Sequence, residues 1–235
     1  MHRAEGADPM KPGDGPLCYF AGGMTPGGLE SAMPKHSKVI AIVGSYRKGG
    51  IIDSAVDEIL ASAALAGADV SKVYLADRNI EFCLNCRRCT QAKGNLRGDC
   101  VHQDDMASLL DEIENADGLV FGSPVNFSTV TALTKRFIER LVCYAEWPWG
   151  ARSPRKRLPR GTRKALLVTS CAMPGFLVPF FTGALRVLKS AAAVLGARPV
   201  GTLIIGLVAQ REQVPLPARA RARARLLGRR LVDPG

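Results

Sequence analysis

Residues 38–50 have the sequence KVIAIVGSYRKGG, in which a short apolar run ends in a loop rich in glycine. The run from Lys38 to Val43 is typical of a buried strand. A helix is expected from about Asp53, because apolar residues then recur at the spacing of one helical face: Val56, Ile59, Leu60 and Ala63. The loop from Gly44 to Gly50 therefore connects a strand to a helix.

The same alternation of strand and helix continues along the chain. Further strands are predicted at Val70–Leu75, Leu119–Phe121, Ala165–Val168 and Val200–Ile205. Helices are predicted around residues 106–113, 130–141 and 180–195. Five strands separated by helices predict an α/β fold, with a doubly wound five-stranded parallel sheet and helices on both faces. Ligands of such sheets bind at the carboxyl ends of the strands, which directs attention to the loops there.

Length and composition are those of a globular protein with one main domain. The 235 residues are 47% hydrophobic and 23% charged, which excludes wholesale disorder, collagen-like repetition and a small disulfide scaffold. Gly and Pro without a period predict a flexible N-terminal extension over residues 1–36. Residues 37–210 then form the sheet domain, and residues 211–235 a basic C-terminal tail or helix.

A cytoplasmic location is expected, without a membrane partner. Residues 1–33 contain no continuous apolar stretch of the kind that a secretory signal needs. The uncharged segment from Ala165 to Leu185 is long enough to span a bilayer, but Pro and Gly residues interrupt it.

The loop after the first strand has the chemistry of a phosphate site. Its glycines let the backbone wrap closely, the start of the following helix offers free N–H groups, and Ser45, Arg47 and Lys48 add donors and charge. It lacks the spacing of a P-loop and of the dinucleotide fingerprint. A flexible basic turn is the alternative interpretation.

The loop after the third strand, Gly122-Ser123-Pro124-Val125-Asn126-Phe127, suits a flat heteroaromatic ring. Pro124 fixes the turn and leaves backbone amides at the sheet edge able to address such a ring. Phe127 can flank the ring or fill the core. Asn126 can bond the ligand or cap the next helix.

Together with the Cys-rich segment Cys83-x-x-Cys86-x-x-Cys89 and with Asp104-Asp105-Met106, these loops resemble the flavodoxin-like NAD(P)H-dependent FMN reductases, and among them the iron-sulfur flavoproteins. The resemblance covers about residues 38–207. It implies a flavodoxin-like fold, bound FMN, and a homodimer or homotetramer that completes the flavin site. Carried over by position, the phosphate contacts are Ser45, Arg47 and the backbone around Lys48, Gly49 and Gly50. The isoalloxazine contacts are Ser123, Pro124, Val125 and Asn126, with Phe127 as a further candidate.

The chain departs from the family pattern within the first loop. Tyr46 stands where the family usually has Pro, and Ile51-Ile52 stands where it usually has Asn-Thr. The two isoleucines remove side-chain donors from the phosphate site. An unpaired phosphate oxygen in a partly buried loop costs about 1 to 3 kcal/mol, so the affinity for FMN depends on the backbone.

Cys83, Cys86 and Cys89 follow one another at two-residue intervals, and Cys100 closes the set. One short loop can then present three thiolates to a [4Fe-4S] cluster, with Cys100 as the fourth ligand. The gap from Thr90 to Asp99 is longer than in the iron-sulfur flavoproteins, so either this insertion folds out as a loop or Cys100 is not a ligand. Zinc, which more often uses separated pairs, and free or redox-active thiols remain alternatives. Cys143 and Cys171 are interpreted as small core residues.

The net charge of +11 is concentrated in two stretches, residues 152–164 and 219–230, which contain no acidic residue. They suit an anionic partner, such as NAD(P)H or an acidic ferredoxin-type protein, or simply a solvated surface. No recognised nucleic-acid module accompanies them, so nucleic acid is not an expected partner. Trp147-Pro148-Trp149, just before the first stretch, is expected to edge a flavin site or to pack.

The sequence thus predicts an NAD(P)H-dependent FMN oxidoreductase or electron-transfer flavoprotein with a [4Fe-4S] cluster. It would pass electrons between a reduced donor, NAD(P)H or ferredoxin, and an acceptor, and no side chain need act as a catalytic acid or base. A cluster-free NAD(P)H-dependent quinone or FMN reductase is the first alternative. A non-enzymatic zinc-containing binding protein is the second.

Overall fold

The computed structural model describes residues 37–94, 96–210 and 214–233, all within the unit formed by residues 36–235. The expected N-terminal extension lies outside the described residues, as do Cys18 and His36. The strands of the main sheet are β1 (Lys38–Val43), β2 (Asp69–Tyr74), β3 (Gly118–Pro124), β6 (Arg163–Ser170) and β7 (Ala197–Ile205). The α-helices are α1 (Ile51–Leu65), α2 (Met106–Glu114), α3 (Ala132–Arg140), α4 (Val178–Phe181), α5 (Ala184–Val194) and α6 (Ala218–Val232).

The main sheet has the strand order β2-β1-β3-β6-β7, and every neighbouring pair is parallel. This order is the one found in flavodoxin-like doubly wound sheets. The predicted fold class is therefore confirmed. The ladders continue past the apolar runs into polar residues, so β6 and β7 are longer than the sequence predicted.

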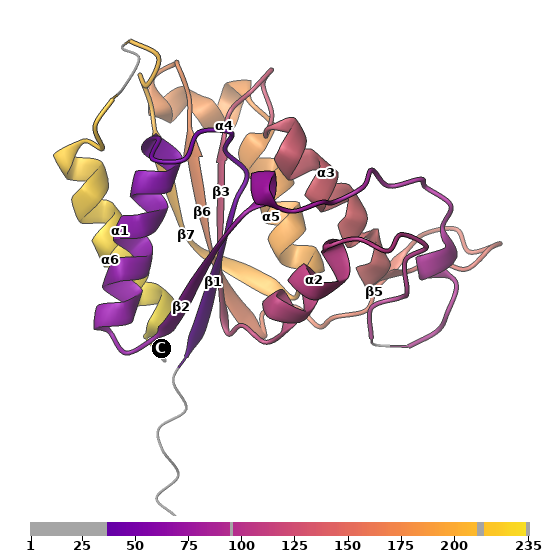
Figure 1. The fold of residues 1–235 in the computed structure, drawn as a ribbon. Helices are drawn as coiled ribbons and strands as arrows, with labels where there is room; N and C mark the ends of the chain where they lie inside the picture. Colours follow the sequence, from indigo (N-terminus) through magenta and orange to yellow (C-terminus); the bar gives the residue numbers. More distant parts are fainter. Residues whose placement is uncertain (1–36, 95, 211–213, 234–235) are drawn as a thin grey trace, which may run out of the picture. The chain divides into compact units, whose positions relative to one another are not determined.

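Helices cover both faces of the sheet because its strands bury side chains on both sides (Figure 1). In β1, Ile40 and Ile42 belong to one apolar cluster, while Val39, Ala41 and Val43 belong to another. Figure 1 shows α1 and α6 on one face, and α2, α3 and α5 on the other. Continuous apolar strands of this kind are typical of parallel sheets that are buried on both faces.

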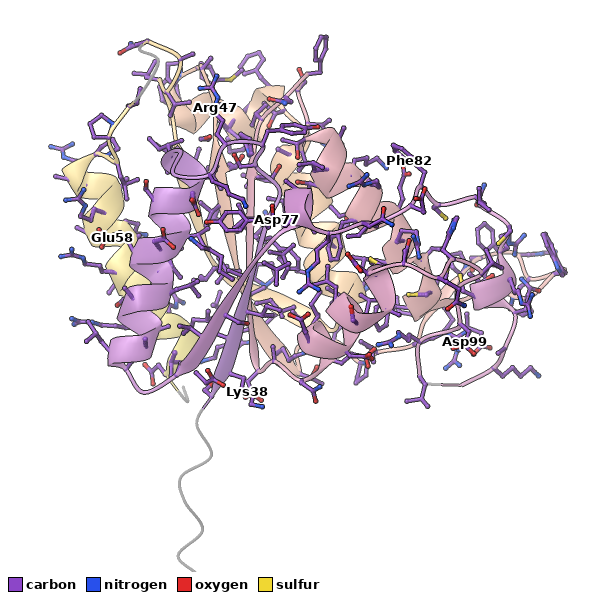
Figure 2. All side chains as sticks on the ribbon, in the orientation of Figure 1. Lys38, Arg47, Glu58, Asp77, Phe82 and Asp99 are labelled. Atoms are coloured by element: carbon purple, nitrogen blue, oxygen red, sulfur yellow. The ribbon has the colours of Figure 1, made fainter. Side chains whose placement is uncertain are left out.

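The basic C-terminal segment contains a helix, α6, that packs along α1. Leu227 and Leu231 are buried in the same cluster as the apolar face of α1. Gly228 lets the two helices approach closely, because a Cβ atom there would lie 2.3 Å from the carbonyl oxygen of Ile59. On the exposed side, Arg221 and Arg225 form ion pairs with Glu58 of α1, labelled in Figure 2.

The helix predicted around residues 180–195 is broken in the structure. A single turn, α4, is separated from α5 by Thr182 and Gly183. Thr182 has an extended backbone, its hydroxyl donates to the carbonyl oxygen of Val178, and the N–H of Gly183 donates to the carbonyl oxygen of Ser128. These contacts end the first turn before the longer helix begins.

A small antiparallel pair, β4 (Ala145–Glu146) and β5 (Arg155–Lys156), was not predicted from the sequence. Strands of two residues are too short to show an apolar period. Four 3-10 turns complete the described structure: η1 (Leu75–Asp77), η2 (Arg88–Thr90), η3 (Leu141–Tyr144) and η4 (Gly175–Leu177). The β4–β5 pair follows η3 and lies against the cysteine-rich segment, as the contacts below describe.

Candidate functional site

The two loops singled out in the sequence lie next to each other at the carboxyl edge of the sheet. They follow β1 and β3, which are neighbouring strands, and the N–H of Gly44 donates to the carbonyl oxygen of Gly122 over 2.8 Å. Figure 2 shows Arg47 at this edge, at the opposite end of the sheet from Lys38. The sequence-predicted phosphate and ring loops are thus brought together.

The first loop turns tightly onto the start of α1. The Ser45 hydroxyl accepts a hydrogen bond from the N–H of Arg47, and Gly49 has a φ of +72°, which favours glycine. Gly50 begins the helix without a side-chain cap. The first N–H groups of an α-helix have no partner within the helix, so they face the loop and can serve an anion.

Asp53 holds this loop from inside the fold. Its carboxylate accepts hydrogen bonds from the N–H of Gly49 at 2.6 Å and from Lys72 and Tyr74, each at 2.8 Å. Burial alone raises the pKa of Asp53, but the bonds from Lys72, Gly49 and Tyr74 outweigh it, so the pKa lies below its usual value. The sequence interpretation missed this residue. The signal was an acidic residue in the first helical turn, with Lys and Tyr two residues apart on the next strand.

The Lys48 side chain is engaged beside the loop rather than over it. Its ammonium group lies 2.7 Å from the carboxylate of Asp77 and 5.0 Å from the centre of the Tyr74 ring. Both partners of the ion pair are more than half exposed, so the pair contributes little stability. Arg47 is exposed at the same loop.

Ser123 joins the two loops through a buried network of hydroxyl groups. Its hydroxyl accepts hydrogen bonds from the N–H of Thr131 and the hydroxyl of Thr134. The Thr131 hydroxyl in turn donates to the carbonyl oxygen of Gly44. The Ser123 side chain is fully buried, so a ring bound at this edge would meet the backbone of Ser123 and not its hydroxyl.

Asn126 and Phe127 form an exposed turn after β3. Asn126 and Thr129 exchange backbone hydrogen bonds, while Phe127 and Ser128 both have positive φ, at 43° and 61°. Phe127 is fully exposed, so the core role considered for it is wrong. The cap of α3 is Thr131, whose side chain accepts from the N–H of Thr134, so Asn126 does not cap this helix. Pro124 and Val125 are half-buried below the turn.

Further aromatic side chains are exposed in the segment that follows β6. Phe176, Phe180 and Phe181 are each more than 60% exposed. The bond from the N–H of Gly183 to the carbonyl oxygen of Ser128 places this segment beside the Phe127 turn. The carboxyl edge of the sheet therefore carries several uncovered aromatic rings next to the two loops.

The four cysteines of the Cys-rich segment line one pocket. Cys83, Cys86, Cys89 and Cys100 share it with Arg87, Arg140 and other residues. Burial, followed by the neighbouring thiols of Cys100, Cys83 and Cys86, raises the pKa of Cys89 to about 11. Figure 2 shows sulfur atoms in the part of the molecule that contains the labelled Phe82 and Asp99. The structure thus brings together the cysteines that the sequence grouped.

The thiols of this pocket are free in the structure. Within the described ranges, no three side chains of His, Cys, Asp or Glu lie close enough together to hold a single metal ion.

The cysteine segment is fastened to the β4–β5 pair by two arginines. The Arg87 guanidinium lies between the rings of Trp147 and Trp149, 4.1 Å from each centre, and donates to the carbonyl oxygen of Trp147. Arg157 donates to the carbonyl oxygens of Cys89, Ala92 and Gly94. The tryptophans, considered above for a flavin edge or for packing, thus pack on the cysteine segment.

Cys143, Cys171 and His102 have structural contacts. Cys143 and Cys171 are buried, as predicted for small core residues. His102 forms a hydrogen bond between its Nε2 and the carbonyl oxygen of Phe82.

Across the described part of the chain, no single helix has the length and apolarity to cross a membrane. Only the bent helix pair 175–181 and 184–194 reaches, when taken together, the length and apolar composition of a membrane span.

Comparisons with known sequences give the family. A model described as NADPH-dependent FMN reductase matches residues 37–175. An iron-sulfur flavoprotein of Archaeoglobus fulgidus is 34% identical over 111 residues, which cover 47% of this chain and 48% of that protein. An iron-sulfur flavoprotein of Methanocaldococcus jannaschii is 35% identical over 103 residues, which cover 44% and 51% of the two chains. The matched part thus spans about half the length of these relatives.

Solved structures share the fold at low sequence identity. An FMN-dependent NADH-azoreductase from Bacillus anthracis in complex with FMN has a TM-score of 0.63 at 12% identity, covering 84% of this chain and 100% of that chain. An NAD(P)H:quinone oxidoreductase from Methanothermobacter marburgensis has a TM-score of 0.58 at 19% identity, covering 83% and 97%. With a family model that spans more than half of its length, this chain belongs to the NADPH-dependent FMN reductase family.

Proposed function

We propose that this protein is an FMN-dependent oxidoreductase that takes electrons from NAD(P)H or a reduced ferredoxin-type protein and passes them to an acceptor. The observation that carries the proposal is the meeting of the β1 and β3 loops at one edge of the sheet. Bound FMN can accept a hydride and release electrons singly or in pairs. The protein's part is to bind and orient this group.

The phosphate would be held mainly by backbone. The N–H groups at the start of α1, together with the Arg47 side chain, offer donors and positive charge to a phosphate. Ile52 is buried against Gly122, and Ile51 is half-buried. Their side chains carry no hydrogen-bond donor, so these two residues can serve the phosphate only through their backbone N–H groups. The flat ring would lie against the backbone of Ser123 to Phe127.

FMN titration tests this binding site. We expect the purified chain to quench FMN fluorescence with a saturable curve. Arg47→Ala should raise the Kd by about ten- to a hundredfold, since a hydrogen bond to a charged group contributes about 1.5 to 3 kcal/mol. Arg160→Ala, which removes another exposed Arg, is the matched control and should leave the Kd unchanged. Folded wild-type protein that binds no FMN contradicts the proposal.

We further propose that Cys83, Cys86, Cys89 and Cys100 hold a [4Fe-4S] cluster. Four thiols around one pocket suit a four-iron cube, in which each iron takes one cysteine. Such a cluster carries one electron at a time. The names of the curated relatives agree with this assignment.

Iron and sulfide analysis of protein purified without oxygen tests the cluster. We expect about four irons and four sulfides per chain, and a large loss of both in Ser variants of the four pocket cysteines. Cys171→Ser is the control, because Cys171 is buried elsewhere and donates to the carbonyl oxygen of Met173. Protein that contains FMN but no iron would favour the cluster-free NAD(P)H-dependent reductase. Protein that contains zinc but no flavin would favour the non-enzymatic zinc-containing binding protein.

The assembly and the compartment belong to the same proposal. A second copy of the chain is the proposed cover for Phe127, Phe176 and Phe180, because rings this exposed beside a ligand site mark an interaction surface. A homodimer or homotetramer is expected by light scattering, and Phe180→Asp should weaken the association of its subunits.

The cytoplasm is the proposed location of the protein, because the described cysteines are free thiols.

A further inference from the structure

A buried ion pair lies at the base of the cysteine segment. The Arg140 guanidinium donates to both carboxylate oxygens of Asp104, over 2.5 and 3.1 Å, and each side chain is only 2% exposed. Burial favours the neutral form of Asp104, but the bonds from Arg140, Glu81 and Met106 outweigh it and lower its pKa. The pair is therefore charged, bidentate and well hydrogen-bonded.

The pair joins the two ends of the cysteine segment. The carboxylate of Asp104 accepts the N–H of Glu81 at 2.8 Å, and Arg140 donates to the carbonyl oxygen of Glu81 at 2.9 Å. Glu81 lies two residues before Cys83, and Asp104 lies four residues after Cys100. One guanidinium thus fastens the chain on both sides of the four cysteines.

The positive end of the pair faces the cysteines. Arg140 lines the pocket with all four of them and interacts with Cys100, whereas Asp104 does not line it. A buried ion pair is not by itself a source of stability, because desolvation offsets the attraction. Thiolates and reduced clusters carry negative charge. A cation held at a pocket of four thiols can therefore stabilise that charge, whereas a buried ion pair elsewhere cannot.

The helix that ends in Arg140 begins at the other candidate site. Thr131, the cap of α3, belongs to the hydroxyl network between the β1 and β3 loops. The nine residues of α3 span about 14 Å at the rise of an α-helix. The same rigid helix therefore connects the proposed flavin loops to the cysteine pocket.

We propose that Arg140, oriented by Asp104, is a positioning residue for the cluster, which closes the base of the cysteine segment and stabilises the reduced cluster by its positive charge. This inference rests on the proposed function, because it requires the cluster. Its two consequences are tighter retention of iron and a higher reduction potential.

Three variants of the holoprotein separate these consequences. Arg140→Lys keeps the charge and removes the bidentate contact. The double variant Arg140→Gln with Asp104→Asn removes the charge without leaving a buried carboxylate unpaired. Lys135→Gln removes an exposed charge from the same helix and is the control. Iron content after a timed exposure to a chelator and the midpoint potential of the cluster are measured for each, with FMN content and circular dichroism as checks of folding.

We expect Arg140→Lys to lose iron faster at a near wild-type potential. The double variant should lower the potential, so that the ratio of reduced to oxidised cluster at a fixed potential falls about tenfold. Lys135→Gln should match the wild type. Retained iron and an unchanged potential in both Arg140 variants overturn the inference while leaving the proposed function intact.

Failures of the proposed function have a different signature. Wild-type protein that holds FMN but no iron, or zinc in place of iron, overturns the cluster assignment and this inference with it. If the double variant does not fold, the Arg140→Lys protein decides, and iron loss at the wild-type rate overturns the inference.

Discussion

Asp53 illustrates how one buried side chain can preorganise a binding loop. Its carboxylate accepts a hydrogen bond from the N–H of Gly49 and two more from the side chains of Lys72 and Tyr74. The loop is thereby fixed without a ligand, so less conformational entropy is lost when an anion binds. The same contact places a negative charge behind the proposed phosphate site, which makes the exposed Arg47 the more important for affinity.

Asp53→Asn should lower the free energy of unfolding by about 1 to 3 kcal/mol, because Lys72 and Tyr74 lose a charged acceptor. Asp57→Asn is the matched control, since Asp57 also pairs with Lys72 but is more than half exposed. We expect a change of at most about 0.5 kcal/mol for the control. Urea unfolding at pH 7 measures both, and equal effects of the two substitutions would contradict the account.

Stability should fall in acid for a defined reason. The pKa values of Asp53 and Asp104 lie below the usual 3.8, because hydrogen bonds outweigh the effect of burial in the fold. A lowered pKa stabilises the fold above the unfolded-state pKa, and this contribution is lost as the pH falls through the folded-state value. Urea midpoints should therefore be steady from pH 7 to about 5 and drop below about pH 4. Asp53→Asn should flatten part of that drop.

The two tryptophans that Arg87 contacts allow the packing of the cysteine segment to be followed by fluorescence. The chain has two tryptophans, and the Arg87 guanidinium lies against both rings. Cation–π contacts contribute about 0.5 to 2 kcal/mol each, so Arg87→Ala should free the rings and increase quenching of their emission by iodide. Arg88→Ala, with an exposed side chain, should leave quenching unchanged. Similar quenching in both variants would show that the contact does not hold the segment.

The helices and strands differ in how far the sequence predicts them. Strand β1 is an apolar run that ends in Gly44, so Lys38–Val43 could be found directly. The edge strand β2, with the sequence DVSKVY, is largely polar, and its predicted bounds differ by one residue from the observed Asp69–Tyr74. The β4–β5 pair could not, because two residues carry no period. The break at Thr182–Gly183 depends on a bond from Gly183 to Ser128, a contact between distant residues that no local pattern encodes.

The sequence singled out the loops of the candidate sites but not Asp53 and Arg140, the buried residues that hold these loops. Glycine, serine and cysteine spacings locate Gly44–Gly50 and Cys83–Cys100, because these motifs are local in sequence. Asp53 and Arg140 act through Tyr74 and Asp104, which are far from them along the chain. The exposure of Phe127 also escaped prediction, since its positive φ is set by the turn with Thr129.

Helix α6 should behave as part of the folded core. Leu227 is 1% exposed against α1, whereas its neighbour Leu226 is 55% exposed. Leu227→Ala should lower the free energy of unfolding by about 2 to 5 kcal/mol, and Leu226→Ala by about 0.5 kcal/mol or less. Thermal unfolding of the pair checks this. A small effect at Leu227 would mean that the packing of α6 on α1 contributes little.

The whole molecule places two candidate redox sites on one sheet. The proposed flavin loops lie at the carboxyl edge after β1 and β3, and the cysteine segment follows β2 and packs on β4–β5 (Figures 1 and 2). Helix α3 begins at the first site and ends at the second. This arrangement suits a protein that exchanges electrons between a carrier of pairs and a carrier of single electrons.

The visible absorption spectrum of protein purified without oxygen, recorded before and after dithionite, tests this account most directly. The account predicts flavin bands over a broad iron-sulfur absorption, with both bleached on reduction. Iron and FMN from the same sample should reach about four irons and one flavin per chain. Flavin bands alone would contradict the two-site account, and a featureless spectrum from folded protein would contradict the flavin site as well.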